Sequence, residues 1–389
     1  MLLQRFPPMG VYETLFRFAS ATGAYMGDLG THPWAQGFPL TSPVPGGPEL
    51  PETIRVGATD RMYPKADGQP ALREAIANYY RDFYGAKITA DHVAVFAGGR
   101  PAIYAILAFL RRESRVVIEE TEYTPYFDLL KVLGRPFDVI PSNPQNRFRP
   151  TLDDHPRAAA SFLIKSNPTN PTGVVCRDAA LAALVAEYSR PGRGALIDEA
   201  YEFFCDPQPV SSLAHVPDID ATDLFVVGAA TKGLQVPGMR VGWVVASREH
   251  IEVLRNYSSF GMGGVSRASQ LYVTELLGTS RVRHARSAIA KFYTSQRRRY
   301  GEALAKLGLE MFSGDGGFYH WCRLPEGLTG DSFNERLFAH KAGILPGRLC
   351  DMHRRGDAGP LGRMFRFSFG PLGPESFDGD VAILKACLG

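Results

Sequence analysis

Short apolar runs alternate with amphipathic helical segments through the middle of this chain, and that alternation limits the folds open to it. The runs cover residues 93–96, 116–119, 137–140, 161–165, 195–198, 224–227 and 241–246. Helical spacing marks segments such as 72–84, 101–112 and 179–189. Apolar strands alternating with helices predict a three-layer α/β fold, with helices on both faces of a mostly parallel sheet. Ligands of such sheets bind beyond the carboxyl ends of the strands.

The length of 389 residues is too great for one simple core, so we expect two domains. The pattern changes towards the C-terminus, where a long basic helix near residues 280–307 is followed by a strand at 364–369. We predict a large domain over residues 46–275 and a smaller α+β domain over residues 276–389. Residues 1–45 are expected to form an arm that completes the small domain.

The composition limits the possible classes of function. The net charge of +3 comes without a long block of Lys or Arg, so we expect no nucleic-acid partner. No apolar stretch is long enough to span a bilayer, and Pro7 and Pro8 interrupt any signal peptide. The cysteines are odd in number and form no Cys-x-x-Cys pair, which argues against disulfides and zinc. We therefore expect a cytoplasmic protein with no membrane contact and no metal.

Lys232 lies just beyond the apolar run 224–227 and before a Pro-Gly turn, and Arg240 opens the next run. A partly desolvated primary amine on a rigid strand end can lose its proton and form a Schiff base with an aldehyde. An arginine eight positions later could hold a phosphate of the same ligand. An aldehyde joined to a phosphate describes pyridoxal 5′-phosphate (PLP). A surface lysine before a turn explains this short run equally well.

Two other polar motifs follow strands. Asp198 ends the run 195–198, where its carboxylate could pair with a protonated pyridine nitrogen, although an N-cap is the simpler interpretation. Residues 167–173, Asn-Pro-Thr-Asn-Pro-Thr-Gly, follow the run 161–165. The two Asn-Pro steps make a rigid turn that fixes side-chain directions. We favour a functional role for this turn over a purely structural one.

Further candidates are weaker when each is taken alone. Gly98, Gly99 and Arg100 open a helix directly after a strand, where free backbone N–H groups can hold a phosphate. Tyr123 follows another strand and could stack on a flat ring or simply pack at a rim. Arg366 lies among aromatic residues in an apolar strand and needs an anionic partner. That partner is either an internal carboxylate or a substrate carboxylate held by a bidentate fork.

In this order, the motifs resemble the fold-type I, class I/II aminotransferase family of PLP-dependent enzymes. The resemblance runs from about Tyr63 to the C-terminus and is highly specific. It rests on Asn-Pro-Thr-Asn-Pro-Thr-Gly, then Asp-Glu-Ala-Tyr at 198–201, Lys-x-x-x-x-Pro-Gly-x-Arg-x-Gly at 232–242 and Arg-x-Ser at 366–368. It implies a PLP-dependent transferase, most simply an aminotransferase that acts on an amino acid.

The resemblance also implies roles around the cofactor ring. Lys232 would form the internal aldimine and later move the proton at the substrate Cα, by way of a quinonoid intermediate. Asp198 would pair with the pyridine nitrogen. Tyr201 and Asn170 would hydrogen-bond the ring oxygen, and Tyr123 would stack on the ring.

The phosphate contacts implied by the resemblance involve a second subunit. The backbone of Gly99 and Arg100 would hold the phosphate together with Arg240. Tyr63 would reach it from the neighbouring subunit, which implies a homodimer with shared active sites. Many relatives carry a serine where this chain has Ala229, so we expect Thr231 and the Arg100 side chain to compensate.

On the substrate side, the resemblance implies that Arg366, aided by Asn170, clamps the α-carboxylate of the amino acid. Relatives also place a glycine-containing N-terminal arm over the substrate. Here that arm is predicted at residues 29–34 in an altered form, with Gly30 as its substrate-binding residue. The alteration leaves the identity of the substrate open.

These departures keep a second hypothesis open. It is a non-transaminating PLP enzyme of the same fold that performs β- or γ-elimination or replacement, C–C bond formation with S-adenosylmethionine, or oxidation. A cofactor-bearing sensor module is a remote third, because the chain has no basic reading head. Six residues are candidates for the substrate pocket, and each could equally be core or rim: Tyr25, His32, Trp34, Phe260, His320 and Arg348.

Overall fold

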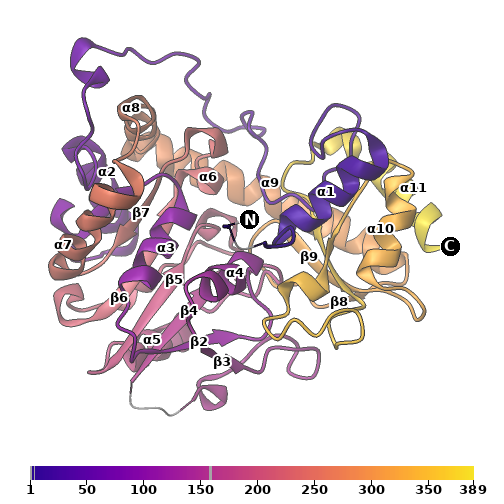
Figure 1. Cartoon of the computed structure of the whole chain (residues 1–389). Coiled ribbons are helices and arrows are strands. Elements are labelled where there is room, and N and C mark those ends of the chain that lie inside the picture. Colours follow the sequence, from indigo (N-terminus) through magenta and orange to yellow (C-terminus); the bar gives the residue numbers. More distant parts are fainter. Residues whose placement is uncertain (1, 4, 157–159) are drawn as a thin grey trace.

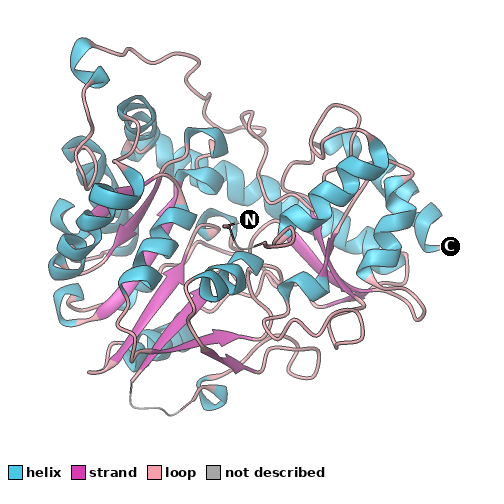
Figure 2. Cartoon of the chain, viewed as in Figure 1, coloured by secondary structure: helices cyan, strands magenta, loops and turns pink. Residues whose placement is uncertain are grey.

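A seven-stranded sheet forms the centre of the protein, in the order β1-β7-β6-β5-β4-β2-β3 (Figures 1 and 2). The computed structural model describes residues 2–3, 5–156 and 160–389. The strands are β1 (Val93–Phe96), β2 (Arg115–Glu119), β3 (Phe137–Ile140), β4 (Ser161–Ser166), β5 (Arg193–Asp198), β6 (Asp223–Ala229) and β7 (Gly242–Val245). Strands β2 to β6 pair in parallel, whereas β7 is antiparallel to β1 and β6. The predicted mostly parallel α/β sheet is therefore confirmed, and each predicted apolar run coincides with a strand.

Successive residues of one strand point to opposite faces of this sheet and enter different apolar clusters. On β5, Leu196 packs on one face and Ile197 on the other. On β6, Phe225 and Val226 divide in the same way. Because helices cover both faces, an apolar side chain is favourable at every position, which explains the continuous apolar runs in the sequence.

Two layers of helices cover the sheet (Figure 1). One layer contains α3 (Gly99–Phe109), α4 (Thr124–Val132) and α7 (Arg248–Tyr257). The other contains α2 (Pro70–Tyr84), α5 (Asp178–Tyr188), α8 (Arg267–Leu276) and the long α9 (Thr279–Lys306). The short α6 (Ala230–Gly233) follows β6 and spans too few residues to show a helical period in the sequence.

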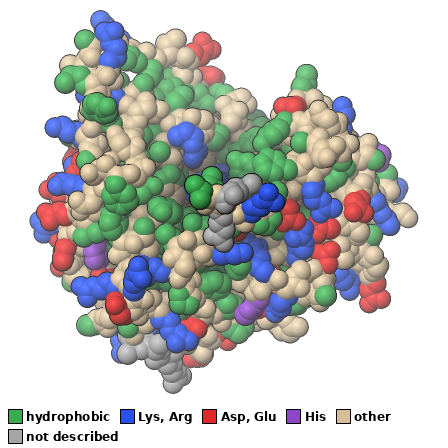
Figure 3. Space-filling model, in the orientation of Figure 1, with side chains coloured by type: hydrophobic (Ala, Val, Ile, Leu, Met, Phe, Trp, Pro, Cys, Tyr) green, Lys and Arg blue, Asp and Glu red, His purple; other side chains and the backbone are tan. Residues whose placement is uncertain are grey.

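A smaller antiparallel sheet lies beside the large one, in the order β10-β11-β9-β8. Its strands are β8 (Glu310–Met311), β9 (Tyr319–Arg323), β10 (Leu345–Pro346) and β11 (Met364–Ser368). The helices near it are α1 (Val11–Thr22), α10 (Gly330–Phe338) and α11 (Phe377–Leu388). Figure 3 shows a notch between the two lobes, with hydrophobic side chains along it.

The N-terminal arm is bonded to the small sheet and to α11. His32 forms a β-bridge with Ala342, and the Ser368 backbone N–H donates to the carbonyl of Trp34 at 2.9 Å. The indole N–H of Trp34 donates to Asp380 at 3.2 Å. Within the described residues, no helix is both long and apolar enough to cross a membrane.

Candidate active site

Lys232 lies in α6, directly beyond the carboxyl end of β6. Its ammonium group donates a hydrogen bond to the carbonyl of Gly37, and Nζ lies 5.6 Å from the centre of the Tyr201 ring. Burial, and then the positive charges of Arg100 and Arg366, lower the pKa of Lys232 to about 7. A large share of this amine is therefore unprotonated near neutral pH, which is the state that attacks an aldehyde.

Asp198 ends β5 and points its carboxylate into the same cavity as Lys232. One carboxylate oxygen accepts the Tyr126 hydroxyl at 2.9 Å, and the other accepts the Ala200 backbone N–H at 3.1 Å. Burial raises the pKa of Asp198, and these two donors oppose the rise. The sequence offered a capping role and a site role as alternatives, and the geometry accommodates both. Tyr126 was not predicted, although it lies one helical turn after Tyr123 on α4.

A cavity of about 320 Å³ lies beyond the carboxyl ends of the central strands. It brings together predicted residues from six separate segments of the chain: Gly99, Arg100, Tyr123, Asn170, Asp198, Tyr201, Thr231, Lys232 and Arg240. Its remaining lining residues were not predicted as site residues: Tyr12, Ile103, Ser166, Ala200 and Ala229. Tyr12 comes from α1, so a helix far away in the sequence contributes one wall.

The start of α3 and the Arg240 side chain meet at one end of this cavity. Gly98 precedes the helix with φ at +102°, and a Cβ there would lie 2.5 Å from Nη2 of Arg240. Only glycine lets the guanidinium approach the helix start so closely. A helix N-terminus beside a guanidinium is suited to bind a phosphate. The Arg100 side chain lines the same cavity, and its Nε donates to the Tyr123 hydroxyl at 3.0 Å.

Arg366 is a buried arginine on β11 with neutral hydrogen-bond partners. Nη1 donates to the side-chain oxygen of Asn170 at 2.8 Å, and Nη2 donates to the carbonyl of Ala35 at 2.7 Å. Its guanidinium also lies 4.2 Å from the centre of the Tyr319 ring. Within the described part of the chain, Nε has no hydrogen-bond partner and no ion pair involves this arginine. The guanidinium is therefore suited to accept an anionic ligand.

The structure does not bring Gly30 or Tyr63 to the cavity of this chain. Gly30 lies in an exposed turn in which Thr31 bonds back to Asp28, before the arm joins the small sheet. Gly37, seven residues later, is the arm glycine that comes close to the cavity, because its carbonyl accepts Lys232 Nζ and a Cβ there would lie 3.6 Å from the Tyr201 hydroxyl. The part of the arm that approaches the cavity is thus at Gly37 and not within the predicted residues 29–34. Tyr63 is 93% exposed.

None of the six candidate pocket residues lines the cavity. Trp34 and His32 both bond Asp380, and His320 is buried with a hydrogen bond to the carbonyl of Arg297. Arg348 pairs with Asp331 and Glu13. Tyr25 and Phe260 are exposed.

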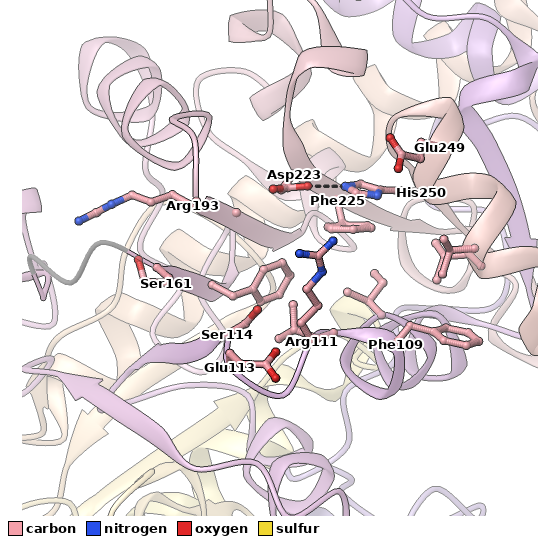
Figure 4. A pocket seen from close by; sticks show the side chains of 18 residues that line it. Phe109, Arg111, Glu113, Ser114, Ser161, Arg193, Asp223, Phe225, Glu249 and His250 are labelled. Atoms are coloured by element: carbon pink, nitrogen blue, oxygen red, sulfur yellow. Dashed lines mark hydrogen bonds and ion pairs between the residues drawn. The ribbon is translucent and has the colours of Figure 1, made fainter.

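A larger hollow, of about 800 Å³, lies at the opposite, amino-terminal ends of the strands (Figure 4). Its walls include Phe109 of α3, Phe225 of β6 and His250 of α7. The His250 ring stacks on Phe225 at 4.7 Å between centres and bonds Asp223 at 2.7 Å. No predicted site residue lines this hollow, because every motif in the sequence follows the carboxyl end of a strand.

The chain is similar to known aminotransferases in sequence and in fold. Residues 34–369 match the family Aminotransferase class I and II. The LL-diaminopimelate aminotransferase of Dehalococcoides mccartyi is 27% identical over 335 residues, which cover 80% of this chain and 83% of that protein. Transaminase BacF of Bacillus subtilis is 26% identical over 348 residues, covering 84% and 82%. A solved aminotransferase from Mycobacterium tuberculosis has the same fold, with a TM-score of 0.80, 23% identity, and coverage of 98% and 97%.

A family match over most of its length shows that the chain belongs to the class I and II aminotransferases. It is a PLP-dependent transferase of fold type I, and its reaction is transamination. Elimination, replacement, C–C bond formation with S-adenosylmethionine and oxidation, which the sequence left open, are not favoured by these relatives.

Proposed function

We propose that the cavity around Lys232 and Asp198 is the PLP site of this aminotransferase. Lys232 would hold the cofactor's aldehyde carbon through Nζ, and Asp198 would face the pyridine nitrogen. Tyr201 and Asn170 would hydrogen-bond the ring oxygen, and Tyr123 would stack on the ring. The observation that carries this proposal is an amine with a pKa of about 7 in one cavity with a buried carboxylate.

The chemistry of the lining residues fits the remaining parts of PLP. For the phosphate, we infer contacts from the α3 N-terminus at Gly99 and Arg100, from Thr231 and from Arg240. The close approach of Arg240 to Gly98 supports this assignment, because the charge and the free N–H groups coincide there. The Arg100 side chain would act through its charge on Lys232, and its guanidinium has N–H groups besides the Nε bonded to Tyr123 with which it could also contact the phosphate.

The substrate would be an amino acid whose α-carboxylate is bound by Arg366. The free Nε of Arg366, and the Asn170 oxygen that orients its guanidinium, support this role. When bound, PLP supplies an electron-withdrawing ring that stabilises negative charge at the substrate α-carbon. Once the substrate has displaced it, Lys232 Nζ would accept the proton of that carbon. A pKa near the working pH suits such a transfer.

We also infer a cytoplasmic homodimer in which each Tyr63 serves the partner's site. Met62 and Tyr63 are exposed, apolar and adjacent, at 65% and 93%, in a segment that projects from the large lobe in Figure 1. Large exposed apolar side chains that cluster are typical of a protein interface. The five free cysteines are consistent with a reducing compartment.

The assignment is tested by locating the lysine that holds PLP. The protein is saturated with PLP, reduced with borohydride and digested, and the labelled peptide is identified by mass spectrometry. We expect the label on Lys232, and we expect Lys232→Ala to lose the visible absorbance and turnover. Lys306→Ala is the matched control, because Lys306 is exposed on α9. A label on another lysine, or full turnover by Lys232→Ala, would show that the assignment is wrong.

A further inference from the structure

Glu122 is a buried carboxyl group whose hydrogen bonds go to two segments of the candidate site. It follows β2, precedes α4 and is 0% exposed. Its oxygens accept the backbone N–H of Tyr123 at 2.6 Å and that of Ser166 at 2.7 Å. They also accept the Ser166 hydroxyl at 2.8 Å. Burial of a carboxyl group is unfavourable unless donors compensate it, and these three donors converge on it.

The Ser166 hydroxyl is bonded to Asn170 as well as to Glu122. The Ser166 hydroxyl oxygen accepts the backbone N–H of Asn170 at 2.9 Å. Because a hydroxyl group has one proton, donating it to Glu122 directs the oxygen lone pairs towards Asn170. The Asn170 side chain then accepts Nη1 of Arg366 at 2.8 Å. A series of hydrogen bonds therefore links Glu122 through Ser166 to the backbone of Asn170, and the side chain of the same Asn170 bonds Arg366.

The neighbouring acid, Glu119, has a different set of contacts. It forms a buried ion pair with Lys165, and Lys165 lies 3.4 Å from the Thr169 hydroxyl. That pair contacts the 167–173 turn at Thr169, whereas the Ser166 hydroxyl is bonded to Glu122. The hydrogen bonds that orient the Ser166 hydroxyl thus come from Glu122 and not from the neighbouring carboxylate of Glu119.

We propose that Glu122 is a positioning residue of the active site, which fixes Asn170 through Ser166 and thereby orients the Arg366 guanidinium. The inference rests on the proposed function, in which Asn170 contacts the cofactor and Arg366 binds the substrate carboxylate. Glu122 also holds the backbone of Tyr123, the residue expected to stack on the ring. One buried side chain thereby sets the mutual placement of the ring contacts and the carboxylate clamp.

The test removes the middle of the series without changing a charge. Ser166→Ala deletes the hydroxyl that lies between Glu122 and Asn170. Ser161→Ala is the matched control, because Ser161 is also buried, lies at the other end of β4, and has no hydrogen-bond partner for its hydroxyl among the described residues. Glu122→Gln provides a second variant at the origin of the series.

Three quantities are measured on purified protein. They are the dissociation constant of PLP, the pH midpoint of the visible absorption of bound PLP, and the dissociation constant of 2-aminoisobutyrate, which has no Cα proton. For Ser166→Ala and Glu122→Gln we expect both ligands to bind about tenfold more weakly, the effect of one lost hydrogen bond. The pH midpoint should rise, because a misplaced Asn170 no longer stabilises negative charge on the ring oxygen. Ser161→Ala should match the wild type in all three.

The outcomes separate this inference from the proposed function. If the wild-type protein does not bind PLP, the proposed function fails, and the inference fails with it. If the wild type binds PLP and Ser166→Ala is indistinguishable from it, only the positioning role is refuted. An equal loss in Ser161→Ala also refutes it, because the effect would then reflect general damage to β4. If Glu122→Gln does not fold, the two serine variants decide the question.

Discussion

The depressed pKa of Lys232 makes a quantitative prediction about the reactivity of the protein without cofactor. An ordinary lysine has a pKa of 10.5, and burial, followed by the charges of Arg100 and Arg366, lowers that of Lys232 to about 7. The difference corresponds to roughly 5 kcal/mol between the charged and neutral forms. At pH 8, roughly 90% of such an amine is neutral, against about 0.3% of an ordinary lysine. Lys232 should therefore be roughly 300-fold richer in the reactive form at that pH.

The assay is acylation of the cofactor-free protein by an amine-specific reagent across a pH series, with each lysine peptide quantified by mass spectrometry. We expect the Lys232 peptide to reach half of its limiting rate near pH 7. The exposed Lys306 reports how the reagent itself varies with pH. A Lys232 midpoint near pH 10 would refute the reasoning that burial and neighbouring positive charge keep this amine neutral.

A substitution at Arg100 tests how far neighbouring positive charge, as distinct from burial, lowers the pKa of Lys232. Arg100→Met removes a positive charge that disfavours protonated Lys232, so the pKa must rise and the midpoint must move to higher pH. Arg100→Lys keeps the charge and is expected to leave the midpoint close to that of the wild type. A midpoint that stays fixed or moves to lower pH in Arg100→Met contradicts the electrostatic argument.

Two further predictions concern the arm and the subunit interface. Gly37→Ala would place a Cβ 2.8 Å from the hydroxyl of the buried Tyr319. We expect the fold to be retained and kcat/KM to fall by a factor that corresponds to about 1–3 kcal/mol of lost transition-state stabilisation. Gly30→Ala, in an exposed turn, should change kcat/KM far less, and equal losses in the two variants would contradict the assignment of the close approach to Gly37. In a mixed dimer of Tyr63→Ala and Lys232→Ala subunits, one of the two shared sites is intact. Co-expression should therefore restore activity that neither variant has alone, and no recovery in an isolated mixed dimer would exclude shared sites.

Several features of the site could be predicted because they depend on local sequence. Lys232, Asp198 and the 167–173 turn each follow a strand whose apolar run is visible in the sequence. Parallel strands place their carboxyl ends at one edge, so these residues converge without further information. The domain boundaries at 45 and 275 stay a prediction.

Other features could not be predicted, because they depend on contacts between distant segments. Gly30 was expected to meet the substrate, but the arm turns back at that point and Gly37 makes the close approach. The partner of Arg366 was left open between a carboxylate of the protein and an external one. Among the described residues its partners are the neutral Asn170 and Ala35 oxygens, so no carboxylate of the protein takes that place and an external carboxylate stays the prediction. The resemblance had already joined Arg366 to Asn170, but no periodicity or motif in the sequence encodes the bond to the Ala35 carbonyl.

The sequence by itself determined the sheet and the family and predicted Lys232 and Asp198 as the principal reactive groups, because strand burial and the residues at strand ends are visible in short runs of adjacent residues. Only the tertiary structure decided how those groups behave. The low pKa of Lys232 arises from burial and from arginines located 132 residues before it and 134 after it in the chain. The link from Glu122 through Ser166 to Asn170 exists because β2 and β4 are neighbours in the sheet, although β3 lies between them in the sequence. Desolvation and hydrogen-bond geometry are properties of neighbours in space, and they are fixed only when the chain has folded.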